Sequence, residues 1–89
     1  MITFDNDEQE YLRWVHNYPT GFVINASKHS GASEYCMLHR ASCAFVSTAQ
    51  RTNYTTTTYK KICSLDRQEL SDWGRKNSNH YSECKMCKP

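Results

Sequence analysis

The sequence predicts a small α+β domain in which an antiparallel sheet of about three strands and two helices are stapled by one structural zinc ion. The chain has 89 residues and is 38% hydrophobic, which suits a single domain, 1–89, with a thin core. Two segments have the apolar spacing of helices and three have the composition of strands. The five cysteines are an odd number, which does not fit a closed disulfide framework. Metal binding would explain them and would stabilise the small core.

The first helix is expected over residues 5–17. Its apolar side chains form one broad face, made by Tyr11, Leu12, Trp14, Val15 and Tyr18. Asp5 or Asn6 is the expected N-cap, and the acidic residues of the first turn suit the positive end of the helix dipole. Pro19 ends the helix, because proline cannot continue it.

Residues 22–26 and 34–38 are expected to form a hairpin joined by a polar loop, 27–33. The first strand is rich in β-branched and aromatic residues, as strands are. Successive side chains along the second strand point to opposite faces. We therefore expect Tyr35, Met37 and His39 on one face, and Cys36 and Leu38 on the other. Lys28 and His29 near the loop tip form a basic pair that could touch phosphate, although loop tips are usually just solvated.

An irregular stretch is expected between the hairpin and the third strand. Phe45 and Val46 could start a short strand or pack beneath the metal. The polar segment 47–58 contains four consecutive threonines and is expected to be a mobile loop. The simplest interpretation is a plain surface loop, and its candidate partner contacts are Arg51, Asn53 and Tyr54.

The predicted fold ends with a third strand over residues 59–63 and a second helix. Ser64 or Asp66 begins this helix, and Glu69 stands three residues after Asp66, which is the spacing of a capping box. The expected apolar face of the helix consists of Leu65, Leu70 and Trp73. A polar turn then leads to the cysteines at the end of the chain.

Two short motifs predict the metal site. Cys84 and Cys87 form a C-x-x-C pair, which can direct two thiolates at one ion from a tight turn. Upstream, His39 and Cys43 form an H-x-x-x-C pair. One imidazole and three thiolates are a common closed zinc set, and thiolates select zinc over hard ions. Cys63 could replace His39 in an all-thiolate set, and the sequence alone leaves this choice open.

Charge is distributed unevenly along the chain. The first 20 residues carry four acidic residues and one arginine, whereas the rest carries ten basic and five acidic residues. A basic body is compatible with a polyanionic partner. We therefore expect a small non-catalytic zinc module that binds nucleic acid, with DNA favoured over RNA. The candidate phosphate contacts are Arg40, Lys60, Lys61, Arg75, Lys76, Lys85 and Lys88, and Tyr54 or Tyr81, if exposed, could stack on a base.

Two alternative functions are consistent with the same residues. The first is a protein-interaction or regulatory module of a larger bacterial system. The second is a thiol-based repair protein that uses Cys36 or Cys63, which would require an exposed thiol of low pKa. Otherwise both cysteines are small buried apolar residues. Four protein ligands would leave the metal no open position for water, so the chain is not expected to be an enzyme.

The expected compartment is the cytoplasm. The sequence lacks the run of about 20 apolar residues that a membrane span needs, so no membrane partner is expected. Its first residues have neither the basic nor the apolar region of a signal peptide. Cysteines stay reduced in the cytoplasm, which suits their use as metal ligands.

His39-x-x-x-Cys43 and the terminal segment 83–89, E-C-K-M-C-K-P, are separated by the predicted third strand and second helix. This arrangement resembles the zinc-binding module of the Ada-type methyl-DNA repair domain and its relatives appended to small nucleases. The resemblance covers residues 38–89 and implies a zinc module that contacts DNA. His39 stands where the repair domain has its methyl-accepting cysteine, and Glu83 replaces the proline before C-x-x-C. The resemblance therefore does not extend to methyl transfer.

Residues 11–43 carry a second pattern, W-x-x-x-x-P-x-G-F-V-x-N followed by L-H-R-A-x-C. This pattern resembles an uncharacterised small domain of bacteria. It implies a bacterial protein and adds no activity.

Overall fold

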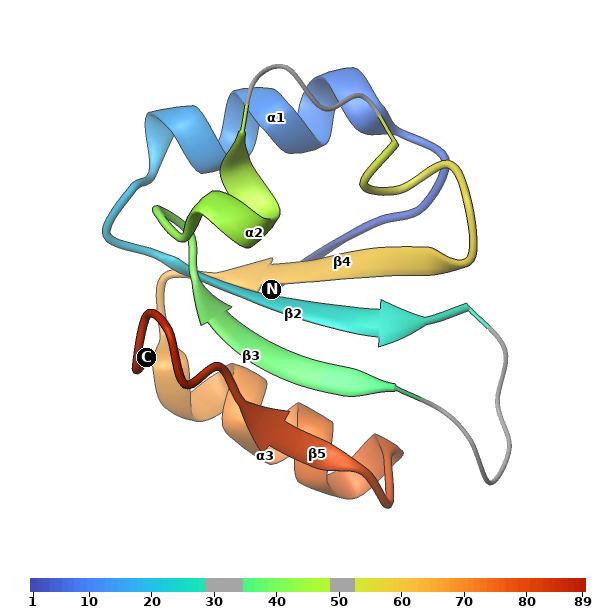
Figure 1. Ribbon diagram of the computed structural model, residues 1–89, viewed down its shortest axis with the longest axis vertical. Helices are drawn as coiled ribbons and strands as arrows, with labels where there is room; N and C mark the ends of the chain where they lie inside the picture. The colour runs from blue at the N-terminus through green and yellow to red at the C-terminus, as the bar shows by residue number, and fades with distance from the viewer. Residues whose placement is uncertain (29–34, 49–52) are drawn as a thin grey trace.

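The computed structural model describes residues 1–28, 35–48 and 53–89. These residues form an α+β fold with a five-stranded sheet and three helices (Figure 1). In chain order the elements are β1 (Ile2–Phe4), α1 (Glu8–Asn17), β2 (Phe22–Ser27), β3 (Cys36–Arg40), α2 (Ala44–Ser47), β4 (Tyr59–Ser64), α3 (Arg67–Asn77) and β5 (Tyr81–Glu83).

The sheet is larger than expected, and it is mixed rather than antiparallel. Its strand order is β1-β4-β2-β3-β5. The three predicted strands are its centre, β2, β3 and β4, and they pair antiparallel. A short strand is added at each edge: β1 pairs antiparallel with β4, and β5 pairs parallel with β3. Three residues are too few for a readable period of two, so the sequence pattern missed both edge strands.

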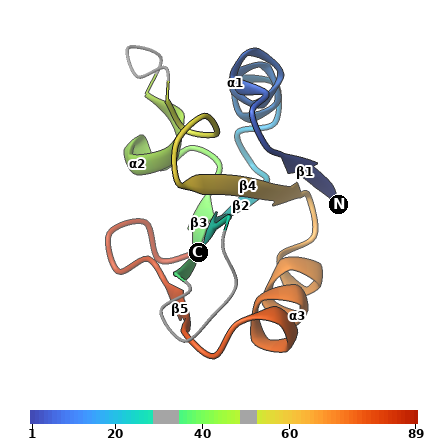
Figure 2. The ribbon, with the colours of Figure 1, turned by 90° about the vertical axis from the view of Figure 1, so that its right-hand side faces the viewer.

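Helices cover both faces of the sheet, as Figure 2 shows, with α1 and α2 on one side and α3 on the other. The alternation of β2 serves both sides, because Val23 packs with the α1 side and Ile24 with the α3 side. The predicted alternation of β3 is also confirmed. Met37 packs against the α1-side cluster, whereas Cys36 and Leu38 belong to the α3-side cluster.

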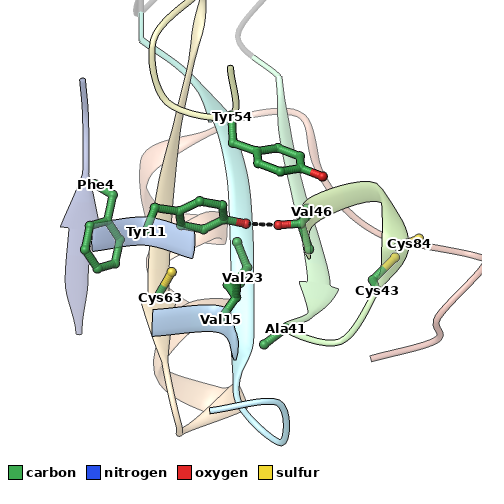
Figure 3. Close-up of a cluster of buried hydrophobic side chains, with 10 residues drawn as sticks. All are labelled: Phe4, Tyr11, Val15, Val23, Ala41, Cys43, Val46, Tyr54, Cys63 and Cys84. Carbon is green, nitrogen blue, oxygen red and sulfur yellow. Dashed lines mark hydrogen bonds between the residues drawn. The ribbon is translucent and has the colours of Figure 1, made fainter. Parts of the chain in front are cut away.

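Aromatic side chains fill the core on the α1 side (Figure 3). The Tyr11 ring contacts Phe4 and Tyr54 edge to face, with centroids 5.8 and 5.6 Å apart. Its hydroxyl donates a hydrogen bond to the carbonyl of Val46, and burial raises the pKa of this phenol far above its usual range. Tyr11 thereby ties α1 to α2. Val46 lies in a four-residue helix and not in the short strand that the sequence suggested.

Two details of the helices differ from expectation. The first helix begins at Glu8 and not at residue 5, because Asn6 takes a left-handed φ of 55° where the chain leaves β1. In α3, Asp66 is the N-cap and accepts from the backbone N–H of Gln68. Glu69 does not complete a capping box with it, because its carboxylate accepts from the Ser64 hydroxyl. Leu65, assigned to the apolar face, is 60% exposed.

The polar segment after α2 is described at Thr48 and from residue 53 onward, so Arg51 lies outside the described residues, as do His29 and most of the hairpin loop. The part from residue 53 onward is not the loose loop that its composition suggested. Tyr54 and Thr55 are buried, at 2% and 0% exposure. The Glu8 carboxylate accepts from the backbone N–H groups of Tyr54 and Thr55, both at 2.7 Å, and from the Thr55 hydroxyl at 3.0 Å. Tyr54 is therefore a core residue and not an exposed stacking group.

Replacing Glu8 with glutamine is expected to destabilise the domain by about 1–3 kcal/mol. The glutamine amide has one acceptor oxygen where the carboxylate has two. Its NH₂ group would therefore face one of the two buried backbone N–H groups, which would be left without an acceptor. The control is Glu10→Gln, which removes an exposed carboxylate paired with Arg13 and should change stability by less than about 0.5 kcal/mol. Urea unfolding measures both. Equal midpoints for the two variants would contradict the role given to Glu8.

Gly74 allows α3 and β5 to pack together, and Gly74→Ala is expected to destabilise the protein. A Cβ at this position would overlap Cδ1 of Tyr81 and lie 2.8 Å from its Cε1 and 3.3 Å from Cδ1 of Ile24. The ring cannot move freely, because Arg75 covers it at 4.9 Å and its hydroxyl bonds to Glu83.

We expect a net loss of about 1–3 kcal/mol from this overpacking, although alanine favours helix by about 1 kcal/mol over glycine. Lys76→Ala, at an exposed position of the same helix, is the control. Urea unfolding should show a lower midpoint only for Gly74→Ala. A midpoint above that of the wild type would mean that the ring gives way and that helix propensity dominates.

Candidate metal centre

The four predicted ligands come together in the fold. The donor atoms of His39, Cys43, Cys84 and Cys87 all lie within 4.8 Å of one another. Among the described residues, these four form the cluster of histidine, cysteine or acidic side chains that could hold a metal ion. Three of the four side chains are buried and Cys87 is half-buried. The predicted clustering of one histidine and three cysteines is confirmed.

Sheet pairing brings the two halves of the site to the same place. His39 lies near the end of β3, and the chain turns immediately after it, so that Cys43 stands at the start of α2. The parallel pairing of β5 with β3 sets Glu83 beside Leu38, and the Cys84 N–H donates to the Leu38 carbonyl at 2.9 Å. The thiols of Cys43 and Cys84 consequently lie side by side at the edge of the α1-side core (Figure 3).

Backbone N–H groups donate to the cysteine sulfurs. Arg40 N–H donates to Sγ of Cys87 at 3.2 Å. Burial alone would raise the pKa of the Cys84 thiol, but backbone N–H groups of Cys87 and Met86 and contacts with the neighbouring thiols lower it overall. Such donors favour the thiolate, which is the form that binds metal.

Cys43 differs from Cys84 in its proton affinity. Burial is the main reason that its pKa is raised to about 11, and the neighbouring Cys87 adds to the effect, although a backbone hydrogen bond at Phe45 acts in the opposite direction. Clustered thiols resist losing their protons together when no cation is near. A divalent cation among them would reverse this, because a coordinating thiol is deprotonated outright.

The fourth donor, His39, has the properties of a ligand. It is 3% exposed. Its Nδ1 is buried and has no hydrogen-bond partner among the described residues. Burial and the charge of Lys61 lower the pKa of the imidazole to about 4, so it is neutral at physiological pH. A neutral imidazole is the form that binds metals, and coordination would satisfy the orphaned nitrogen. The residues present therefore fit a metal ion.

Arg40 fastens the C-terminal turn to the end of β3. Its Nε donates to the Cys87 carbonyl and its guanidinium NH₂ to the Lys88 carbonyl, both at 2.9 Å. Within the turn, the Lys88 N–H donates to the Cys84 carbonyl at 3.1 Å. The sequence marked Arg40 only as a candidate phosphate contact. Its hydrogen bonds depend on a contact across 47 residues, which no local pattern could have revealed.

Among the described residues, Cys36, Cys63 and His80 are not part of this centre. Cys63 is fully buried on β4 and Cys36 is buried on the α3 side of the sheet. Neither belongs to the metal-binding group, so the all-thiolate alternative with Cys63 is not formed. Burial raises the pKa of Cys63 far above its usual range, which does not suit a reactive thiol. His80 is exposed, and its backbone N–H donates to the Ser78 hydroxyl.

Six of the seven candidate phosphate contacts are exposed or half-buried, namely Arg40, Lys60, Arg75, Lys76, Lys85 and Lys88. The exception is Lys61, which is 2% exposed. Its ammonium donates to Asn25 Oδ1 at 2.8 Å and to the Tyr54 carbonyl at 2.5 Å. Lys61 is thus an internal residue and is no longer a candidate phosphate contact. Tyr81, the other stacking candidate, is half-buried beneath Arg75.

These features define the chain as an α+β domain with a candidate centre of one histidine and three cysteines that could bind a metal ion. Comparisons with protein-family models, with curated proteins and with solved structures found no match. In the part of the chain that the structure describes, no helix has the length and apolar character needed to cross a membrane.

Proposed function

We propose that this protein is a small zinc-stapled module that binds nucleic acid and does not itself catalyse a reaction. The observation that carries the zinc assignment is the convergence of His39, Cys43, Cys84 and Cys87 on one point. One imidazole and three thiolates are soft donors that suit tetrahedral zinc. The ion would join β3 and the start of α2 to the C-terminal turn, and it would stabilise a domain whose core is small for its length.

A structural role for the ion follows from the number of ligands. Four protein donors complete a tetrahedral sphere and leave no position for water or substrate. The histidine at position 39 also stands where the Ada-type repair domain has its methyl-accepting cysteine, so the proposal keeps the resemblance to that zinc module without its chemistry. What remains is a rigid platform that presents side chains to a partner.

The side chains around the proposed zinc site favour a polyanion. Lys85 and Lys88 are exposed on the C-terminal turn, and Arg40 is exposed at the end of β3 beside it. Ammonium groups near the surface contact phosphates and release counterions on binding. Arg75 and Lys76 are exposed at the end of α3 and are further candidate phosphate contacts. DNA is the nucleic acid that we favour.

Salt-dependent binding tests this function. The zinc-loaded protein is titrated into a fluorescent 20-base-pair DNA duplex, and anisotropy is measured between about 50 and about 200 mM salt. Affinity should fall with salt, and Lys85→Gln should reduce the slope of log K against log salt by about 0.9, the value for one phosphate contact. Arg13→Gln, which removes one charge from α1, is the matched control and should leave the slope unchanged. If the protein bound neither the duplex nor single-stranded DNA at low salt, the proposal would be refuted.

A second candidate function is recognition of a protein partner, and a separate surface favours it. Four exposed apolar side chains border a pocket of about 420 Å³ near β1, namely Met1, Ile2, Tyr18 and Leu65. Exposed apolar patches commonly mark interaction sites. Leu65→Glu should abolish association with a protein partner and leave DNA binding unchanged, and competition between such a partner and the duplex would show that the two surfaces are not separate.

A further inference from the structure

A groove lies directly beside the candidate metal centre. It encloses about 700 Å³, a size typical of sites for small organic groups. Figure 2 shows that α2 and the C-terminal turn, which supply two of its walls, lie on the same side of β3. Its lining includes Asn25, Tyr35 and His39 from the strands, Phe45 from α2 and Lys85 from the C-terminal turn.

Two aromatic rings of the groove are partly exposed and contact neighbouring rings. Phe45 is 55% exposed, and its ring meets His39 edge to face with centroids 6.5 Å apart. Tyr35 is 37% exposed, its ring contacts Tyr59 in the same geometry at 5.6 Å, and its hydroxyl donates to the sulfur of Met37. An exposed aromatic ring is suited to stacking against a planar partner, and a side chain with only two rotatable bonds loses little conformational entropy when it stacks.

Polar and charged groups of the groove complement the edge of a base and its phosphate. Asn25 Oδ1 accepts from the Lys61 ammonium at 2.8 Å, so its amide NH₂ is a donor available for a base oxygen or ring nitrogen. Lys85 is exposed at the rim and carries the positive charge that a phosphate needs.

We propose that this groove is a subsite for one unpaired nucleobase of a single-stranded segment. Phe45 is the stacking platform, Asn25 contacts the base edge, and Lys85 contacts the adjoining phosphate. The inference rests on the proposed function and deepens it, because it names the form of nucleic acid that the module prefers. A paired base cannot enter such a groove without leaving its stack, so single strands should bind more tightly than duplex.

Binding of short homopolymers tests the subsite. Fluorescent oligo(dT) and oligo(rU) of 12 nucleotides and a 12-base-pair DNA duplex are titrated with the zinc-loaded protein. Phe45→Ala should weaken binding of the single strands roughly tenfold, as expected for the loss of one stacked base, and Phe45→Trp should restore it. The control is Tyr18→Ala, which removes a similarly exposed ring outside the groove and should have no effect. Metal content and thermal melting verify that each variant is intact.

The outcomes separate this inference from the function on which it rests. Salt-dependent binding that is equal for single strands and duplex and unchanged in Phe45→Ala would overturn the subsite and leave the proposed function standing. Absence of binding to all three probes would overturn both. If an apolar peptide bound to the wild type but not to Phe45→Ala, and the oligonucleotides did not bind, the groove would belong to a protein partner and the subsite would be refuted. A similar loss for oligo(dT) and oligo(rU) supports stacking without discrimination by the sugar.

Discussion

Replacement of Cys84 by serine is expected to abolish metal binding and to unfold the domain. Serine retains the size of the side chain but not the thiolate, and Cys84 is a buried member of the four-donor cluster. Structural zinc contributes apparent binding energies of about 10–16 kcal/mol in small domains, whereas net stabilities of folded proteins are about 5–15 kcal/mol. Loss of the ion should therefore remove most of the stability. Elemental analysis and far-UV circular dichroism of the purified variant measure the two effects.

The matched control is Cys36→Ser, which changes a buried cysteine on the opposite face of the sheet. This variant should keep one metal ion per chain, although the buried hydroxyl lowers its melting temperature. Cys87→Ser should behave like Cys84→Ser, and a chelator should unfold the wild type. One ion per chain in Cys84→Ser, or an unchanged melting temperature after complete removal of metal from the wild type, would refute the stapled fold.

Substitution of Lys61 by methionine is expected to destabilise the protein by about 2–4 kcal/mol. Methionine matches the apolar stem but cannot donate to the Tyr54 carbonyl or to Asn25 Oδ1. Each buried acceptor left without a partner costs about 1–3 kcal/mol. The ammonium also lies 5.6–5.9 Å from the ring centres of three tyrosines, Tyr11, Tyr54 and Tyr59, so attraction between the cation and these rings is lost as well.

Urea unfolding of metal-loaded Lys61→Met and Lys60→Met measures this effect. Lys60 is the half-buried neighbour on the same strand, and its replacement should change stability by less than about 1 kcal/mol. A loss in Lys61→Met no larger than that in Lys60→Met would show that the buried ammonium contributes no more than a surface lysine. The salt dependence of duplex binding by Lys61→Met should match that of the wild type, because the buried ammonium is no phosphate contact.

The metal ligands illustrate how much could be predicted from local sequence. The spacings Cys84-x-x-Cys87 and His39-x-x-x-Cys43 indicate pairs of donors that one turn can hold, whatever surrounds them. The same is true of the central strands and of the faces of the main helices, which follow from periods of 2 and 3.6 residues. These features depend on neighbours along the chain, and the clustered donors and the three central strands are present in the structure.

The choice between His39 and Cys63 shows where local reasoning stops. In the order β4-β2-β3-β5, three strand spacings separate β4, which carries Cys63, from β5. At about 4.8 Å each, this amounts to about 14 Å, too far for Cys63 to share an ion with Cys84. His39 is on the adjacent strand and points to the same face as Cys43 and Cys84. The parallel pairing of β3 with β5 decides the ligand set, and no pattern in the sequence indicates that pairing.

Spacing and periodicity are local properties, so they were enough to predict a small α+β chain with two pairs of soft metal donors. The three-dimensional structure was needed to show that the sheet has five strands, that Lys61 and Tyr54 are internal, and that Glu8 binds the backbone of Tyr54 and Thr55. Each of these depends on a contact between distant residues: 46 residues separate Glu8 from Tyr54, and 36 separate Asn25 from Lys61. From the sequence alone, a lysine, a tyrosine or a threonine is expected at the surface. Such a residue lies in the core when the fold supplies partners for its polar groups.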